Sequence, residues 1–143
     1  MDVDSLYQEI ILDHYKKPHG RGLREPYEAE VHHVNPSCGD EVTLRVHLDG
    51  GSVRDVSYEG LGCSISQASA SMMTQLLKGK DVGEVEAIRA RFRDMVMGDK
   101  DAAEDASLGS LRALGGVARF PARVKCALLA WNALETALAK RAE

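Results

Sequence analysis

VTLRVHLDGG, residues 42–51, alternates apolar and polar side chains and ends in a turn sequence. A period of two places the valines and leucines of this stretch on one face of a β-strand, and we expect His47, between them, to face solvent. Asp49-Gly50-Gly51 is typical of a tight turn, and residues 53–58 then supply a returning strand. The stretch therefore predicts an antiparallel hairpin with one buried face.

The rest of the chain shows mainly helical periodicity. We expect helices over residues 6–17, 66–78, 82–97 and 121–143, and a first strand over residues 27–31. Asp99–Asp105 reads as a solvated loop, followed by a short helix at residues 108–114 that Gly115-Gly116 interrupts. The predicted architecture is α+β: a small antiparallel three-stranded sheet packed against helices, in a single domain over residues 1–143.

Composition narrows the classes of function. The 18 basic and 22 acidic residues give a net charge of −4, without a basic stripe interleaved with aromatics, which argues against nucleic acid as the main partner. Three cysteines are an odd number, which fits a reducing compartment better than a disulfide framework. No apolar run reaches membrane-spanning length, and the acidic N-terminus does not resemble a signal peptide. We therefore expect a cytoplasmic protein with no membrane partner.

Each cysteine lies in a distinctive local sequence: NPSCGD at residues 35–40, GLGCSIS at 60–66 and RVKC at 123–126. In an extended segment, Cys38 and Asp40 point to the same side. Together with Cys63 and Cys126 they make four ligands of the kinds that a tetrahedral zinc ion accepts. The working hypothesis is a zinc site assembled from three distant segments.

The alternative is that the cysteines are small hydrophobic core residues. Cys38 and Cys63 follow proline or glycine, where regular structure breaks and a core residue is less expected. Cys126 is the weaker case, because the apolar run ALLA follows it directly at residues 127–130. Its place near the start of the last helix nevertheless favours the thiolate, since the N-terminal end of a helix carries partial positive charge.

Two cations precede the third cysteine. Arg123 lies one turn before Cys126 and is the best candidate for a charged contact with a partner, although it could equally be a solvated residue at a helix start. Lys125 would offset the net charge of −2 that three thiolates, one carboxylate and Zn²⁺ carry together. We therefore name both as candidate partner-binding residues.

The motifs around the cysteines resemble the IscU/SufU (NifU N-terminal-like) family of iron–sulfur cluster assembly proteins, and the match extends over nearly the whole chain. Besides the three cysteine motifs, LY at residues 6–7 and ILDHY at 11–15 resemble the N-terminal helix of that family. Lys125, at the position of a histidine in IscU-type scaffolds, and the long stretch around residues 82–105 place the chain nearer SufU.

The resemblance implies a zinc-containing, sulfurtransferase-like carrier that accepts persulfide sulfur from a PLP-dependent cysteine desulfurase of the SufS type. It implies Cys38, Asp40, Cys63 and Cys126 as zinc ligands and Cys38 as the sulfur acceptor. Transfer requires Cys38 to leave the metal, and a downstream iron–sulfur scaffold would receive the sulfur.

Two rivals stay open. One is an IscU-type scaffold on which a transient iron–sulfur cluster is assembled, because such clusters also need thiolates. The other is a purely structural zinc domain that serves as an interaction module. A cysteine hydrolase is disfavoured, since no histidine lies in a motif that pairs it with a cysteine.

Overall fold

A three-stranded antiparallel sheet forms one layer of the molecule. The computed structural model describes residues 3–36 and 39–140. The strands are β1 (Ala29–Asn35), β2 (Asp40–Asp49) and β3 (Ser52–Leu61), in the order β1-β2-β3. The predicted hairpin is confirmed as β2 and β3, with Gly50 in the turn at φ 62°. The first strand begins two residues later than expected and extends to Asn35.

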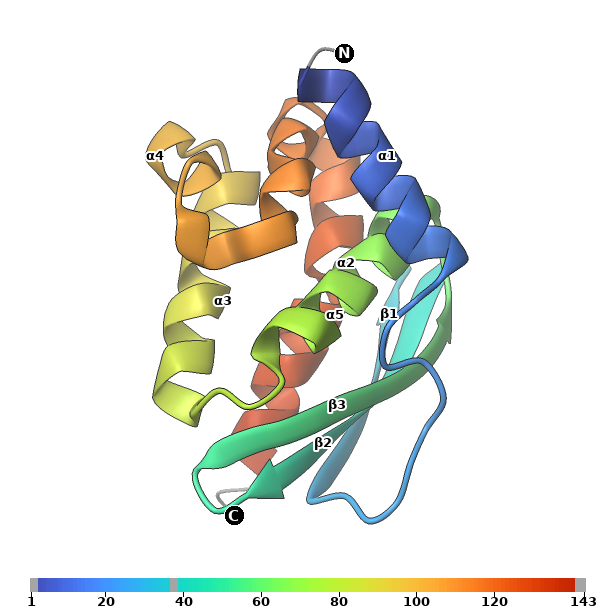
Figure 1. The fold of residues 1–143 in the computed structure, drawn as a ribbon. Coiled ribbons are helices and arrows are strands. Elements are labelled where there is room, and N and C mark those ends of the chain that lie inside the picture. Colours follow the sequence, from blue (N-terminus) through green and yellow to red (C-terminus); the bar gives the residue numbers. More distant parts are fainter. Residues whose placement is uncertain (1–2, 37–38, 141–143) are drawn as a thin grey trace.

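Helices cover one face of this sheet (Figure 1). They are α1 (Val3–Lys16), α2 (Ser64–Leu77), α3 (Val82–Val96), α4 (Lys100–Ala103), the 3₁₀ segment η1 (Ala106–Arg119) and α5 (Pro121–Lys140). The helices α2 and α5 pack directly on the strands, α1 lies against α2, and α3 packs beside η1. The predicted α+β architecture is thus confirmed. None of the helices in the described part of the chain combines the length and apolar character that a membrane crossing requires.

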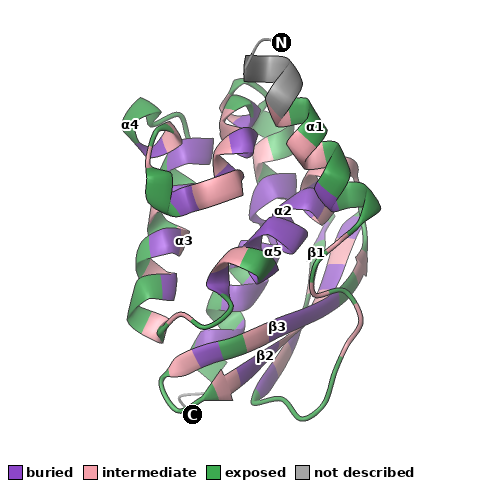
Figure 2. Ribbon diagram, in the orientation of Figure 1, coloured by how far each residue is buried: buried purple, intermediate pink, exposed green. Residues whose placement is uncertain are grey.

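The core lies between the sheet and the helices, where buried positions face inward (Figure 2). Leu44, Val46 and Val56 are fully buried on the inner face of the sheet, as the alternation in the hairpin predicts. On the helical side, Trp131 of α5 stacks on Phe92 of α3 with ring centroids 4.9 Å apart. This packing anchors α5, the helix that carries Cys126.

His47 does not face solvent, so that expectation was wrong. The long connection between α1 and β1 passes over this histidine on the outer face of the sheet; only 3% of His47 is exposed. Its Nδ1 donates to the carbonyl of Pro26 at 2.6 Å, and the Ser57 hydroxyl lies 2.7 Å from its Nε2. The alternation of apolar and polar residues identifies which side chains of a strand point away from the core. It does not show whether a loop covers the outer face of the sheet.

The segment between α3 and α5 also differs from expectation. Asp99–Asp105 is not simply a solvated loop, because Asp99 accepts the backbone N–H groups of residues 101 and 102 and starts α4, which buries Ala102. The following helical segment, η1, passes through Gly115-Gly116 rather than stopping there. Gly115 lies against α3 and α4, and this packing compensates for its low helix propensity. The actual kink is at Gly109, at φ 54°.

Candidate metal centre

Asp40 is the first residue of β2 and lies opposite Asn35, the last residue of β1. Gly39, immediately before Asp40, has φ 75° and donates its N–H to the Asn35 carbonyl at 2.9 Å. A positive φ is readily adopted only by glycine. Asp40 follows this glycine and is only 3% exposed.

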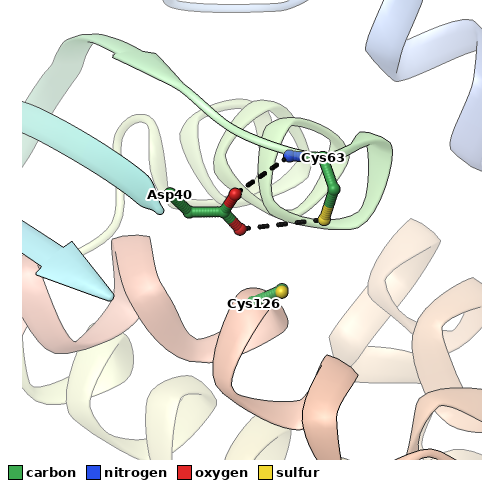
Figure 3. A group of neighbouring side chains, drawn as sticks. All are labelled: Asp40, Cys63 and Cys126. Atoms are coloured by element: carbon green, nitrogen blue, oxygen red, sulfur yellow. Dashed lines mark hydrogen bonds between the residues drawn. The ribbon is translucent and has the colours of Figure 1, made fainter. Parts of the chain in front are cut away.

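Cys63 lies at the junction of β3 and α2, where it is the N-cap residue of the helix. Its backbone N–H donates to Asp40 Oδ1 at 3.2 Å, and its thiol lies 3.7 Å from Asp40 Oδ2 (Figure 3). The residue is half-buried. The sheet and α2 thus present a carboxylate and a thiol to each other.

Cys126 comes from the second turn of α5 and is 2% exposed. Its Sγ lies 3.8 Å from the Ala122 carbonyl, one turn earlier in the helix. Figure 3 shows Cys126 on the opposite side of the centre from α2, facing Asp40 and Cys63. One ligand atom from each of the three residues lies within 4.8 Å of the other two.

This arrangement fits a zinc ion. Zn–S bonds near 2.3 Å in a tetrahedron put two sulfur ligands about 3.8 Å apart, so a small contraction of the observed cluster would suffice. Two thiols and one carboxylate are donors that zinc accepts. The fourth predicted ligand, Cys38, lies outside the described residues, two positions before Asp40. The structure therefore brings together three of the four predicted ligands.

Two glycines at the end of β3 allow this close approach. A Cβ atom on Gly62 would collide with the Ser66 hydroxyl and lie 3.0 Å from the Asp40 carboxyl group. A Cβ atom on Gly60 would collide with the backbone carbonyl of Glu41. The GLG sequence before Cys63 was the available signal for these roles, but it became interpretable only with the fold.

The candidate partner-binding residues Arg123 and Lys125 lie on the first turns of α5, and both are exposed. Arg119 and Phe120, immediately before α5, add a further cation and an exposed aromatic ring. Sequence reasoning missed these two residues. The surface next to Cys126 is thus locally basic in a chain of net charge −4.

A sheet covered by helices on one face, with two thiols and a carboxylate converging at one end, defines a small α+β protein with a candidate thiolate metal centre. The chain belongs to the family described as NifU-like N terminal domain, whose model matches residues 6–142.

Relatives of this chain carry two different descriptions. It is 47% identical over 140 residues to the zinc-dependent sulfurtransferase SufU of Bacillus subtilis (strain 168), covering 97% of this chain and 93% of that protein. It is 42% identical over 140 residues to the iron-sulfur cluster assembly scaffold protein IscU of Streptococcus pyogenes serotype M1, covering 98% and 87%. The crystal structure of FiSufU from Fervidobacterium islandicum AW-1 superimposes with a TM-score of 0.80 at 37% identity, covering 96% and 99%.

Proposed function

We propose that this protein binds a zinc ion through Cys38, Asp40, Cys63 and Cys126 and accepts persulfide sulfur on Cys38 from a PLP-dependent cysteine desulfurase of the SufS type. The observation that carries the proposal is the convergence of Asp40, Cys63 and Cys126 within 4.8 Å from three distant segments. Similarity to the zinc-dependent sulfurtransferase SufU of Bacillus subtilis supports the choice of metal and of activity.

The bound metal would hold the cysteines as thiolates, the reactive form of the side chain. Asp40 is the one oxygen donor in a set of sulfur donors, and oxygen suits zinc less well than thiolate in such surroundings. Because Asp40 also accepts the backbone N–H of Cys63, its carboxylate remains anchored when its bond to the metal weakens. We infer that Asp40 keeps the site labile enough for Cys38 to react.

The transfer step is a thiol–persulfide exchange. The Cys38 thiolate attacks the terminal sulfur of the desulfurase persulfide. A new S–S bond forms on Cys38, the S–S bond of the donor breaks, and the donor cysteine leaves as a thiolate. No external oxidant or reductant is consumed. A downstream iron–sulfur scaffold would then take the sulfur from Cys38 by the same exchange.

Arg123 and Lys125 are suited to guide the donor to this site. Both are exposed beside Cys126, and surface cations chiefly raise the rate of encounter with an acidic partner. Stimulation of the desulfurase should therefore weaken as salt is added. Neutralising Arg123 should raise the concentration of this protein needed for half-maximal stimulation without changing its metal content.

The test measures alanine production by a SufS-type desulfurase with cysteine as substrate. Wild-type protein should contain one zinc per chain and raise the turnover, because persulfide transfer replaces slow release by reductant. Cys38→Ala and Cys38→Ser should abolish the stimulation, and mass spectrometry of the wild type should find an added sulfur atom in the peptide that contains Cys38. Wild-type stimulation by Cys38→Ala would show that the mechanism is wrong.

A scaffold function is the second candidate, favoured by the 42% identity to the Streptococcus pyogenes protein described as IscU. Lys125 in place of a histidine argues against it. Anaerobic reconstitution with iron and sulfide distinguishes the two functions. A stable brown chromophore that transfers to an apo-acceptor protein would favour the scaffold, whereas colourless protein that retains zinc would favour the sulfur carrier.

A further inference from the structure

A groove with a volume of about 540 Å³ lies beside the metal centre, between α1, η1 and the start of α5. Most of its wall is apolar, formed by Tyr7, Ile11, Ile65, Val117 and Phe120. Phe120 is 57% exposed, so its ring is available to a ligand. This volume is within the range of small-molecule sites, roughly 300–1,000 Å³.

The charged side chains that line the groove are both arginines, Arg119 and Arg123, and none of its described lining residues is acidic. Among the side chains that the structure describes, those of residues 7–36 and 39–140, neither arginine has an ion-pair partner, in contrast to Arg24 and Arg45, which pair with carboxylates. The Arg119 guanidinium lies 5.9 Å from the centre of the Phe120 ring. The groove therefore combines an apolar wall with cations that have no acidic partner within those ranges.

The start of α2 adds to the positive potential. Ser64 and Ile65, the first two residues of this 14-residue helix, line the groove. The N-cap residue, Cys63, makes no side-chain hydrogen bond to the first turn. The N-terminal end of a helix carries partial positive charge that favours an anion. Asp40 already accepts the N–H of Cys63 at this helix start, so the positive charge of the groove rests mainly on the two arginines.

We propose that this groove binds a small amphipathic carboxylate, a compact aromatic or branched apolar body with a carboxylate at one end. The apolar body would pack against Val117, Ile11 and the Phe120 ring. The carboxylate would receive hydrogen bonds from Arg119 or Arg123, which a planar guanidinium can donate in pairs. The apolar lining disfavours a small inorganic anion, which would leave that wall without a partner.

A ligand bound in the groove would affect the metal centre, because residues that line the groove are close in sequence to two of the proposed metal ligands. Ser64 directly follows Cys63, and Arg123 lies one helical turn before Cys126. A ligand that contacts α1, α2 and α5 together would also restrain α1, so bound protein should melt at a higher temperature. This inference does not depend on sulfur transfer, because binding is measured without a desulfurase.

The test titrates 2-naphthoate into the protein as purified and follows binding by calorimetry and amide chemical shifts. We expect saturable binding, with shifts centred on residues 64–65 and 117–123. The neutral isostere 2-naphthamide should bind about tenfold more weakly, since it keeps the apolar body but lacks the charge that strengthens hydrogen bonds from a guanidinium. Arg119→Gln or Arg123→Gln should produce a similar loss, and Phe120→Ser should weaken both probes.

The matched control is Arg93→Gln, which removes an exposed arginine of α3 that does not line the groove and should leave the affinity unchanged. The proposal would be overturned if 2-naphthamide bound as tightly as 2-naphthoate, or if 2-naphthoate showed no saturable binding. It would also be overturned if Arg93→Gln lost as much affinity as the groove variants. Binding only of a peptide with adjacent phenylalanine and glutamate, without 2-naphthoate, would also overturn it and assign the groove to a protein partner.

Discussion

At the scale of single residues, Gly62 gives the sharpest test of how the metal centre is built. Gly62→Ala would place a methyl group against the Ser66 hydroxyl and 3.0 Å from the Asp40 carboxyl group. We expect a loss of about 1–3 kcal/mol in the free energy of unfolding from overpacking and, because a ligand is displaced, a loss in zinc affinity on the order of tenfold. Thermal unfolding and competition with a chromophoric chelator measure the two effects.

The control for this change is Gly51→Ala, because a Cβ atom there meets nothing within 4 Å. It should leave zinc affinity unchanged. If both variants retained wild-type zinc affinity, the close approach of Gly62 to Asp40 would have no role in metal binding.

Residue types and their spacing identified the chemistry of the site but not its shape. The spacing of Cys38 and Asp40 and the glycines before Cys63 indicated metal ligands before any fold was known. The structure brings Asp40, Cys63 and Cys126 together. Gly62 and the buried His47 could not be identified in the same way. Their roles depend on which distant segment lies beside them, and local sequence patterns contain no such information.

At the scale of elements, α1 is held to α2 by a buried polar contact. His14 Nδ1 and the backbone N–H of His19 both lie 2.8 Å from the Ser71 hydroxyl oxygen, and the two imidazole rings are 5.3 Å apart. Burial lowers the pKa of His14 below its ordinary value of 6.5, and His19 lowers it further, while Asp13 opposes both. Protonation of His14 therefore costs more in the folded protein than in the unfolded chain.

This pKa shift has a defined sign for stability. Above about pH 6.5 His14 is neutral in both states, so its contribution is fully present; as the pH falls below 6.5, the unfolded chain binds a proton that the folded protein resists. Stability should decline there by at most about 1.4 kcal/mol per pH unit from this group. Urea unfolding between pH 7.5 and 5 should show a smaller decline for His14→Gln than for the wild type, and an equal decline in the two proteins would contradict this role of His14.

Elements with strong periodicity were predictable, and those that depend on tertiary packing were not. The hairpin, α2, α3 and α5 follow from apolar spacing and turn residues. The short helix α4 and the continuation of η1 past Gly115 do not, because capping by Asp99 and packing against α3 outweigh a composition that favours a loop. Local propensity is a weak guide where neighbouring elements supply the contacts.

At the scale of the whole molecule, the proposed ligands tie together the start of β2, the junction of β3 with α2, and α5. Because these segments are far apart in sequence, metal binding free energy becomes folding free energy. Removal of zinc by a chelator should lower the melting temperature on the order of 10 °C. Differential scanning calorimetry before and after removal, with re-addition of zinc, measures the shift and its reversal.

Asp40→Ala separates the carboxylate's contribution to metal binding from its contribution to the fold. Its loss also removes the acceptor for the Cys63 N–H, so the informative quantity is the difference between zinc-loaded and zinc-free melting temperatures within each variant. We expect this difference to be smaller in Asp40→Ala than in wild type but not zero, since the three thiolates remain. Asp49→Ala, at the exposed far end of the same strand, should retain the full difference. An unchanged melting curve after verified removal of zinc from wild-type protein would show that the metal does not hold the three segments together.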